Sequence, residues 1–359
     1  MFTRKIAAAL ALAAAVGPGF APAADYPVPV EADYVIPDFR FASGEVLPQL
    51  RIHYRTLGQP RRDAKGVVRN AVLILHGTTG SGAQFLRPEF AGELFGLGQP
   101  LDATRYFIIL RDGIGHGASS RPSERLHGRF PHYGYEDMVA ADYQLLTQGL
   151  GVNHARLVMG TSMGGMHTWL WGERHPEFMD ALMPLASVPG PISGRNRMWR
   201  RAIIDAIRND PEWRNGEYIK PPVGLKVAAE IQFFMGSNPR LRYRDAPTLA
   251  RADQILDDYV SYYVATEDAN DILYAFEASR DYDPGPALEK IAAPLIAINT
   301  ADDLINPPEL GILEREIKRV AGGRAVVLPL SEETVGHGSH TKAALWKTYL
   351  VELLQAPQR

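Results

Sequence analysis

A serine flanked by glycines is the first feature of this chain that could do chemistry. Gly160-Thr161-Ser162-Met163-Gly164 matches the pattern G-x-S-x-G, after the apolar run Arg156–Met159 and before a helix-like segment, Met163–His175. Between a strand and a helix, this pattern holds a nucleophilic serine on a sharp turn, where glycines allow the flanking backbones to approach closely. Ser162 is therefore the predicted nucleophile, and the helix N-terminus behind it would favour an oxyanion.

A serine hydroxyl becomes an effective nucleophile only when a neighbouring base takes its proton. In folds that use this turn, the partners follow in the chain order serine, acid, histidine. Two acids, Asp302 and Asp303, come just after the strand-like run Pro294–Thr300. A carboxylate beyond a strand end could orient an imidazole and stabilise its charged form, so either residue is a candidate for the triad acid.

The base is sought in the loop after the last strand-like run, in Gly336-His337-Gly338-Ser339-His340. His337 is preferred because it follows a glycine in this late loop. His340 is the alternative, and it could instead stand at a helix N-terminus or face a lid.

An oxyanion hole needs two backbone N–H groups. Met163, directly after the nucleophile, would provide one. The other would come from the loop His76-Gly77-Thr78-Thr79-Gly80, where Thr78 is preferred and Thr79 is next. His76, at the end of a strand-like run, is expected to brace this loop.

Short apolar runs bounded by turn residues predict the sheet that must position these groups. Several are continuous rather than alternating, as is typical of parallel strands buried on both faces. The predicted strands are Leu50–Leu57, Ala71–His76, Tyr106–Arg111, Arg156–Thr161, Ala181–Ala186, Pro294–Thr300 and Arg324–Leu330. Helix-like segments such as Tyr135–Leu150 alternate with them, so we expect an α/β fold with helices on both faces of a mostly parallel sheet.

This alternation stops after Ser187 and resumes at Pro294. In between, apolar residues recur at helical spacing, as in Leu225–Phe234 and Ile255–Val264. We therefore predict a helical cap over residues 189–286 and a core formed by residues 24–188 and 287–359. Aromatic residues of the cap that could line a substrate pocket are Trp199, Tyr218, Phe233, Phe234, Tyr262 and Tyr263.

Residues 1–23 have the layout of a secretory signal peptide. Arg4 and Lys5 precede the apolar run Ile6–Val16, and Ala21-Pro22-Ala23 offers a cleavage site. The run is shorter than the roughly 20 residues that span a bilayer. We expect a mature chain without a membrane span, located in the periplasm or outside the cell.

Composition excludes several other classes of protein. The 359 residues include no cysteine, which excludes disulfides, thiolate-bound metals and thiol catalysis. The formal net charge of -3 lacks the basic character of a nucleic-acid binder. No metal-binding histidine spacing is present, so we expect no cofactor. The expected partner is a small-molecule ester or other acyl substrate.

These motifs together resemble the α/β-hydrolase superfamily and, within it, the homoserine O-acetyltransferase family. The similarity covers nearly all of the predicted mature chain. It includes the loop His76–Gly80, the turn Gly160–Gly165 and the insertion segment Asp210–Leu225. The resemblance implies an acyl-serine intermediate and, by analogy, a possible homodimer formed through cap helices.

The resemblance also decides between the two acids. Asp303 lies four residues before Pro307, which is the common spacing in the superfamily, and this favours Asp303 over Asp302. The other acid would then cap a turn or the following helix.

Two departures from the family pattern concern the substrate. The acyltransferases typically carry an aspartate directly after the catalytic histidine and an arginine six residues before the aspartate of an Asp-Pro pair. These groups hold the amino and carboxylate groups of homoserine. Here the two positions are Gly338 and Ile204, with Arg200 and Arg201 about one turn away. Loss of a matched charge pair weakens selection for an amino acid.

Export points in the same direction, because acetyl-CoA is a cytosolic cofactor. We therefore expect an exported serine hydrolase that cleaves a carboxylic ester or related acyl bond. The alternative is an O-acyltransferase that uses acetyl-CoA.

Overall fold

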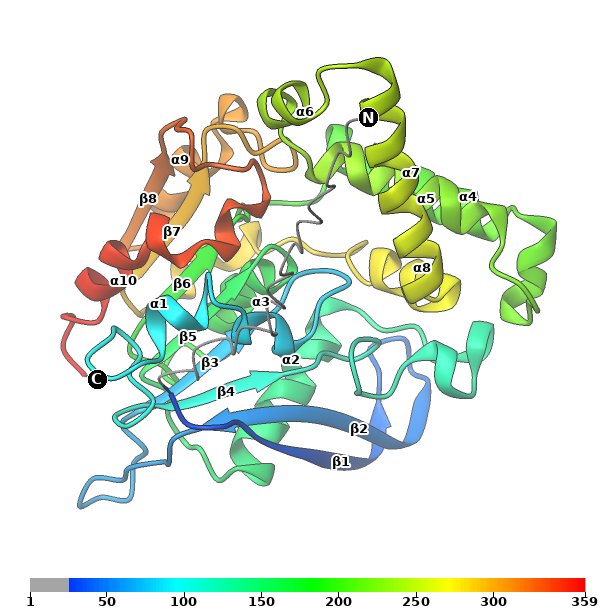
Figure 1. The fold of residues 1–359 in the computed structure, drawn as a ribbon. Coiled ribbons are helices and arrows are strands. Elements are labelled where there is room, and N and C mark those ends of the chain that lie inside the picture. The colour runs from blue at the N-terminus through cyan, green and yellow to red at the C-terminus, as the bar shows by residue number, and fades with distance from the viewer. Residues whose placement is uncertain (1–25, 359) are drawn as a thin grey trace, which may run out of the picture.

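The computed structural model describes residues 26–358, and the predicted signal peptide lies outside them. An eight-stranded sheet forms the centre of the molecule, in the order β1-β2-β4-β3-β5-β6-β7-β8 (Figure 1). The strands are β1 (Val30–Arg40), β2 (Val46–Leu57), β3 (Ala71–Leu75), β4 (Phe107–Arg111), β5 (Leu157–Thr161), β6 (Leu182–Leu185), β7 (Leu295–Thr300) and β8 (Gly323–Leu328). The pairs from β4 to β8 are parallel, whereas β1–β2 and β2–β4 are antiparallel. The predicted α/β fold with a mostly parallel sheet is confirmed.

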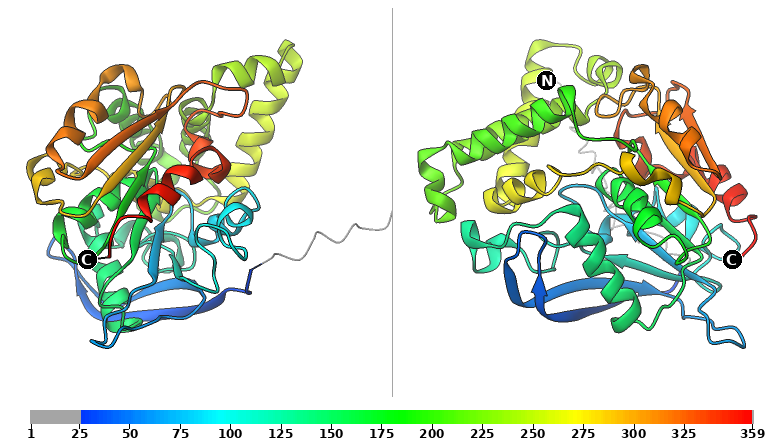
Figure 2. Two further views of the ribbon diagram at one scale, coloured as in Figure 1. Left: turned by 90° about the vertical axis from the view of Figure 1, so that its left-hand side faces the viewer. Right: turned by 180° about the vertical axis from the view of Figure 1, so that it is seen from behind.

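The central strands β3 to β7 consist entirely of buried residues, as their continuous apolar runs predict. Alternate residues of β3 point to opposite faces. Leu73 and Leu75 pack in the core under α2 (Tyr135–Gln144) and α3 (Met163–Arg174). Val72 and Ile74 instead pack in the core that contains α1 (Ala91–Leu94) and α10 (Lys347–Leu353). Figure 2 shows these layers from two further sides.

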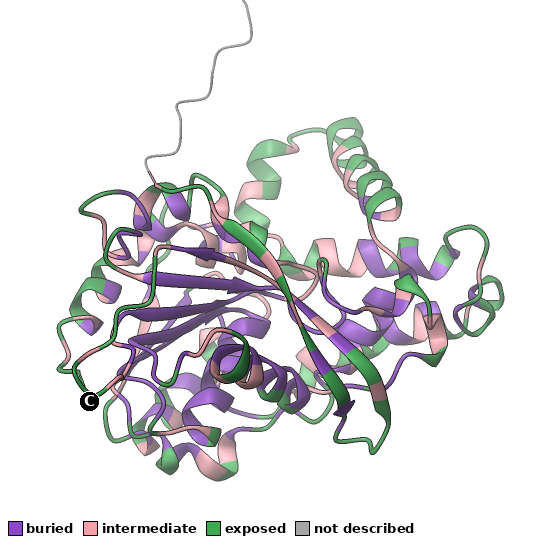
Figure 3. Cartoon of the chain, turned by 90° about the horizontal axis from the view of Figure 1, so that it is seen from below, coloured by how far each residue is buried: buried purple, intermediate pink, exposed green. Residues whose placement is uncertain are grey.

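The strand β1 was not predicted from the sequence. Its side chains are mostly exposed or half-buried and it contains Pro37, so it has neither the continuous nor the alternating apolar pattern of a strand. Pairing with β2 over nearly its whole length holds it at the edge of the sheet. Figure 3 shows the hairpin largely green and pink beside the purple central strands.

Five helices lie between residues 189 and 286, with a 3₁₀ segment, Pro211–Gly216, between the first two. The helices are α4 (Gly194–Arg208), α5 (Val223–Gly236), α6 (Pro239–Asp245), α7 (Leu249–Thr266) and α8 (Ala269–Glu277). Their apolar faces form a separate core that includes Ile203, Leu225, Ile272 and Phe276. We call residues 189–286 the cap. The cap lies over the carboxyl ends of the central strands in Figure 1.

The remaining helix of the core, α9 (Ile312–Glu316), follows β7. Within residues 26–358, no helix is both long and apolar enough to cross a membrane. The same residues contain no group of three or more histidine and acidic side chains that could hold a metal ion.

Candidate active site

Ser162 lies on a strained turn between β5 and α3. Its backbone angles are φ 55° and ψ −112°, in a region that residues with side chains rarely adopt. Two glycines allow this geometry. A Cβ on Gly164 would stand 1.9 Å from the carbonyl oxygen of Leu75, and one on Gly160 would stand 2.2 Å from that of Gly164. The predicted close approach of strand and helix around Ser162 is therefore present.

Ser162, His337 and Asp303 are joined by hydrogen bonds. The Ser162 hydroxyl lies 2.8 Å from Nε2 of His337, which can accept its proton. On the other side of the ring, Nδ1 donates to Oδ2 of Asp303 over 2.9 Å. These groups come from the ends of β5 and β7 and from the loop after β8, far apart in the chain. The arrangement is that of a nucleophile, a general base and the acid that orients the base.

Asp303 is buried but keeps its negative charge. Burial alone would raise the pKa of its carboxyl, but attraction to His337 and hydrogen bonds from His337 and the amides of Asn306 and Ile305 outweigh it and lower the pKa. Those two amides donate to Oδ1 over 3.1 and 2.8 Å. Asn306 also ties this turn to β6, because its Nδ2 donates to the carbonyl of Ala186 over 2.8 Å.

Asp302 has a different role from the one expected. It caps neither a turn nor a helix; the turn-capping role belongs to Asp303. Oδ2 of Asp302 accepts from the backbone N–H of Gly336 over 3.0 Å and from the side-chain amide of Asn238, which is in the cap. Asp302 therefore connects the cap to the residue that precedes His337.

His340 does not reach Ser162. Its ring packs edge-on against that of His337, with centroids 5.3 Å apart. Burial, followed by repulsion from His337, lowers the pKa of His340 to about 3, so it is a neutral wall of the site. It lies in a short 3₁₀ helix, Gly338–Thr341.

The predicted oxyanion donors lie on both sides of Ser162. Met163 is the first residue of α3, and its amide donates to no acceptor within residues 26–358; the same holds for Thr78. The loop of Thr78 packs against the nucleophile, since a Cβ on Gly77 would lie 3.4 Å from the Ser162 Cβ. His76 braces this loop: Nδ1 donates to the carbonyl of Gly77 over 2.8 Å, and Nε2 accepts from the amide of Gly113 over 2.9 Å.

A charged network beneath α3 was not predicted from the sequence. Arg111, fully buried at the end of β4, pairs with Asp142 over 2.8 Å and donates to Nδ1 of His167 over 2.9 Å. Burial is the main cause that raises the pKa of Asp142 to about 6, and Arg111 opposes it. Through Asp142 and His167, Arg111 joins the sheet to α2 and α3. No sequence motif marks this network, because each of its residues comes from a different element.

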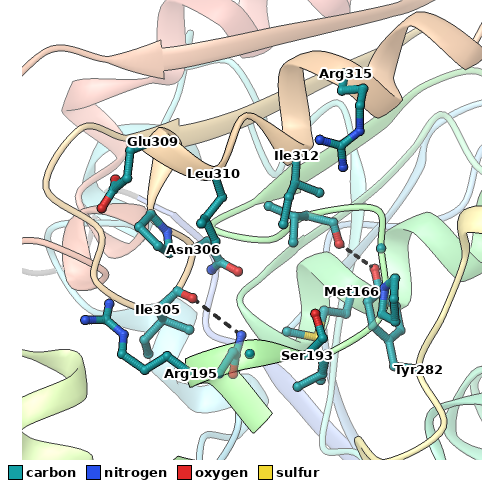
Figure 4. A pocket seen from close by; sticks show the side chains of 17 residues that line it. Met166, Ser193, Arg195, Tyr282, Ile305, Asn306, Glu309, Leu310, Ile312 and Arg315 are labelled. Carbon is teal, nitrogen blue, oxygen red and sulfur yellow. Dashed lines mark hydrogen bonds between the residues drawn. The ribbon is translucent and has the colours of Figure 1, made fainter. Parts of the chain in front are cut away.

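A cavity of about 470 Å³ lies where the cap joins the core, beside the triad turn. Met166, one turn along α3 from the nucleophile, Asn306 and Tyr282 line it (Figure 4). The first residues of α4, including Asn196, form another wall. The aromatic residues of the cap that were expected to line a pocket do not share one surface. Trp199 and Tyr263 are buried in the cap core, whereas Phe234 and Tyr262 are exposed.

The chain belongs to the α/β hydrolase fold family, whose model matches residues 70–329. It is 30% identical over 279 residues to a probable acyltransferase from Methanothermobacter thermautotrophicus, covering 77% of this chain and 84% of that protein. It is also 31% identical to a homoserine O-acetyltransferase from Pelobacter propionicus, covering 75% of this chain and 81% of that protein.

Solved structures of both kinds of enzyme have the same fold. An acetylester hydrolase from Corynebacterium glutamicum superposes with a TM-score of 0.78 at 20% identity, over 91% of this chain and 96% of that one. A homoserine O-acetyltransferase from Bacillus anthracis has a TM-score of 0.79 at 19% identity, over 93% of this chain and 100% of that one. The chain is thus an α/β-hydrolase-fold enzyme of the esterase or acyltransferase type, and the fold does not distinguish the two reactions.

Proposed function

We propose that this protein is an exported serine hydrolase that cleaves a carboxylic ester or related acyl bond. The observation that carries the proposal is the hydrogen-bonded series of Ser162, His337 and Asp303, with contacts of 2.8 and 2.9 Å, on a strained turn. Ser162 attacks the ester carbonyl while His337 takes its proton. The amides of Met163 and Thr78 stabilise the oxyanion, and His337 then protonates the leaving alcohol. Water, activated by His337, releases the acid from Ser162.

Two features favour water over another acceptor. The residue after His337 is Gly338, and Ile204 is a buried apolar residue of α4, so neither position can hold a charged group of an amino acid acceptor. The predicted signal peptide would also separate the enzyme from cytosolic acetyl-CoA.

The test is hydrolysis of short-chain p-nitrophenyl esters by residues 24–359. We expect Ser162→Ala to lose activity and labelling by a fluorophosphonate, since the nucleophile is gone. Activity that survives this substitution contradicts the proposal. Recovery of the intact protein from a periplasmic or culture fraction tests the export, and retention in the cytoplasm contradicts it.

An O-acyltransferase is the second candidate, because the relatives that share 30 to 31% identity carry acyltransferase names. It predicts that acetyl-CoA is consumed only when homoserine or another hydroxyl acceptor is present. Ester hydrolysis in water alone, without acceleration by these acceptors, excludes it.

A further inference from the structure

Arg200 is a buried cation of α4 that the proposed mechanism does not use. Its side chain is 2% exposed and forms no ion pair within residues 26–358. Nε donates to the side-chain oxygen of Asn196 over 2.8 Å, and Nη1 donates to the Ser279 hydroxyl over 3.1 Å. The rings of Trp199 and Phe276 cover the guanidinium at 4.9 and 5.7 Å. A buried charge without an opposite charge is costly, and an anion bound there would reduce that cost.

Further polar groups surround this guanidinium. The buried Tyr135 hydroxyl lies within hydrogen-bonding reach of Arg200, Ser279 and Thr78. Neither this hydroxyl nor that of Thr78 forms a well-aligned hydrogen bond among residues 26–358. Among the same residues, Nη1 of Arg197 is buried without a hydrogen-bond partner, and the positive charge of Arg197 acts on Arg200. A cluster with this excess of donors suits a ligand that carries several acceptor lone pairs and a negative charge.

The cluster adjoins the reaction centre. Thr78 contributes both the predicted oxyanion amide and one of these buried hydroxyls. The cavity in Figure 4 lies next to the cluster, because its wall residue Asn196 accepts from Arg200. Tyr282, also in that wall, has its ring centroid 5.9 Å from that of Tyr135.

We propose that Arg200 binds a carboxylate group of the substrate, with the Tyr135 and Thr78 hydroxyls as further donors. The natural substrate is then an anionic ester, and this inference rests on the proposed hydrolysis at Ser162.

Matched pairs of esters test the proposal. In the first pair, p-nitrophenyl hemiglutarate carries a carboxylate on the acyl side and p-nitrophenyl pentanoate is its neutral counterpart. In the second pair, the acetyl ester of 3-hydroxypropionate carries the carboxylate on the alcohol side and propyl acetate is its neutral counterpart. We expect the wild-type enzyme to prefer the anionic member of one pair in kcat/KM. Arg200→Met should reduce that anionic-to-neutral ratio about 10- to 100-fold, the value of a charge-assisted hydrogen bond. The ratio in Arg200→Lys should lie between those of the wild-type enzyme and Arg200→Met, because an ammonium keeps the charge but lacks the planar fork of a guanidinium.

Arg201→Gln is the matched control. Arg201 is the next residue of α4, but its side chain is 62% exposed and pairs with Asp205 over 2.6 Å on the surface. The ratio should stay at the wild-type value in this variant. The proposal is overturned if neither anionic ester is preferred, or if Arg200→Met leaves the ratio unchanged while a fluorophosphonate still labels Ser162.

A binding measurement separates this inference from the proposed function. In Ser162→Ala, glutarate should raise the melting temperature, and in Ser162→Ala combined with Arg200→Lys this stabilisation should be weaker. Equal stabilisation of both proteins contradicts the role of Arg200. Undiminished ester hydrolysis by Ser162→Ala would instead contradict the proposed function and leave the glutarate result standing.

Discussion

Two adjacent aspartates have different partners because they leave the turn after β7 in different directions. Asp303 is buried against His337, whereas Asp302 contacts the cap and the amide of Gly336. The residue pattern could identify the pair but could not separate their roles, since that separation depends on which side chain faces the imidazole. Only the spacing to Pro307, taken from the family resemblance, favoured Asp303 in advance.

Replacement of each aspartate by asparagine tests this assignment. Asp303→Asn should lower kcat by about 10⁴-fold, because an amide cannot stabilise the imidazolium or select its tautomer. Asp302→Asn keeps one acceptor oxygen and stays outside the triad, so its kcat should fall less than about tenfold. Steady-state kinetics on a p-nitrophenyl ester measure both values. The reverse order of effects would assign the acid role to Asp302.

At the scale of elements, the turn at Ser162 requires contact between the backbones of α3 and β3. Gly164→Ala should destabilise the protein by more than about 3 kcal/mol, because the new Cβ would meet the Leu75 carbonyl and a backbone cannot move aside cheaply. Gly92→Ala in α1 is the control, since a Cβ there has nothing within 4 Å. Denaturant unfolding measures both variants, and equal midpoints would show that α3 can shift without cost.

Burial explains which elements could be predicted from the sequence. The strands β3 to β7 are buried on both faces, so their apolar runs stand out between turn residues. β1 could not be predicted, because its stability comes from pairing with β2 rather than from its own apolar residues. The helix predicted to end at Leu150 ends as α2 at Gln144 and continues as a π-helical segment, Leu145–Gly149, which propensities do not signal.

The joint between α8 and the core should respond to pH. Asp271 of α8 accepts from the amide and hydroxyl of Ser123 over 2.9 and 2.6 Å, and burial is the main cause that raises its pKa to about 7. The folded state therefore binds this proton more tightly than the unfolded state, where a normal aspartate has a pKa of about 4. Its contribution is fully present below pH ~4 and is lost as pH rises through about 7.

Asp271→Asn removes this titration and keeps an oxygen for the Ser123 amide. Between pH 5 and pH 8, the melting temperature of the wild-type protein should fall relative to that of the variant by at least about 2 °C. Because both proteins share all other titrating groups, the difference isolates Asp271. A constant difference across this range would contradict the raised pKa.

For the whole molecule, the cap and the catalytic loops behave as connected parts. Gln232 of α5 contacts the loop His76–Gly80, which carries the predicted oxyanion donor Thr78. Nε2 of Gln232 donates to the Thr79 hydroxyl over 3.4 Å. Asn238 contacts Asp302 and, through it, the loop of His337. The cap thus contacts two of the segments that the proposed mechanism requires, the loop of Thr78 and the turn of Asp303. These contacts lie between segments far apart in the chain and could not be predicted from spacing.

Asn238 allows this connection to be tested apart from the stability of α6. Its side-chain oxygen also caps α6 by accepting from the amides of Arg240 and Leu241 over 2.9 and 3.2 Å. Asn238→Asp keeps a good helix cap but sets a second carboxylate against Asp302. We expect kcat/KM to fall about tenfold, because the like charges push the loop of His337 away from its position, and a misplacement of about 1 Å can cost up to 100-fold. Limited proteolysis should cut the cap faster than in the wild-type protein.

Asn238→Ser serves as the partner variant, since serine also caps a helix but neither repels Asp302 nor reaches it. Its kcat/KM should lie between those of the wild-type protein and Asn238→Asp. If charge repulsion acts on the His337 loop, a higher salt concentration should restore only a small part of the activity of Asn238→Asp. A buried charge pair is poorly screened by salt. Wild-type activity in Asn238→Asp, measured on the same ester, would show that the cap does not position the catalytic histidine.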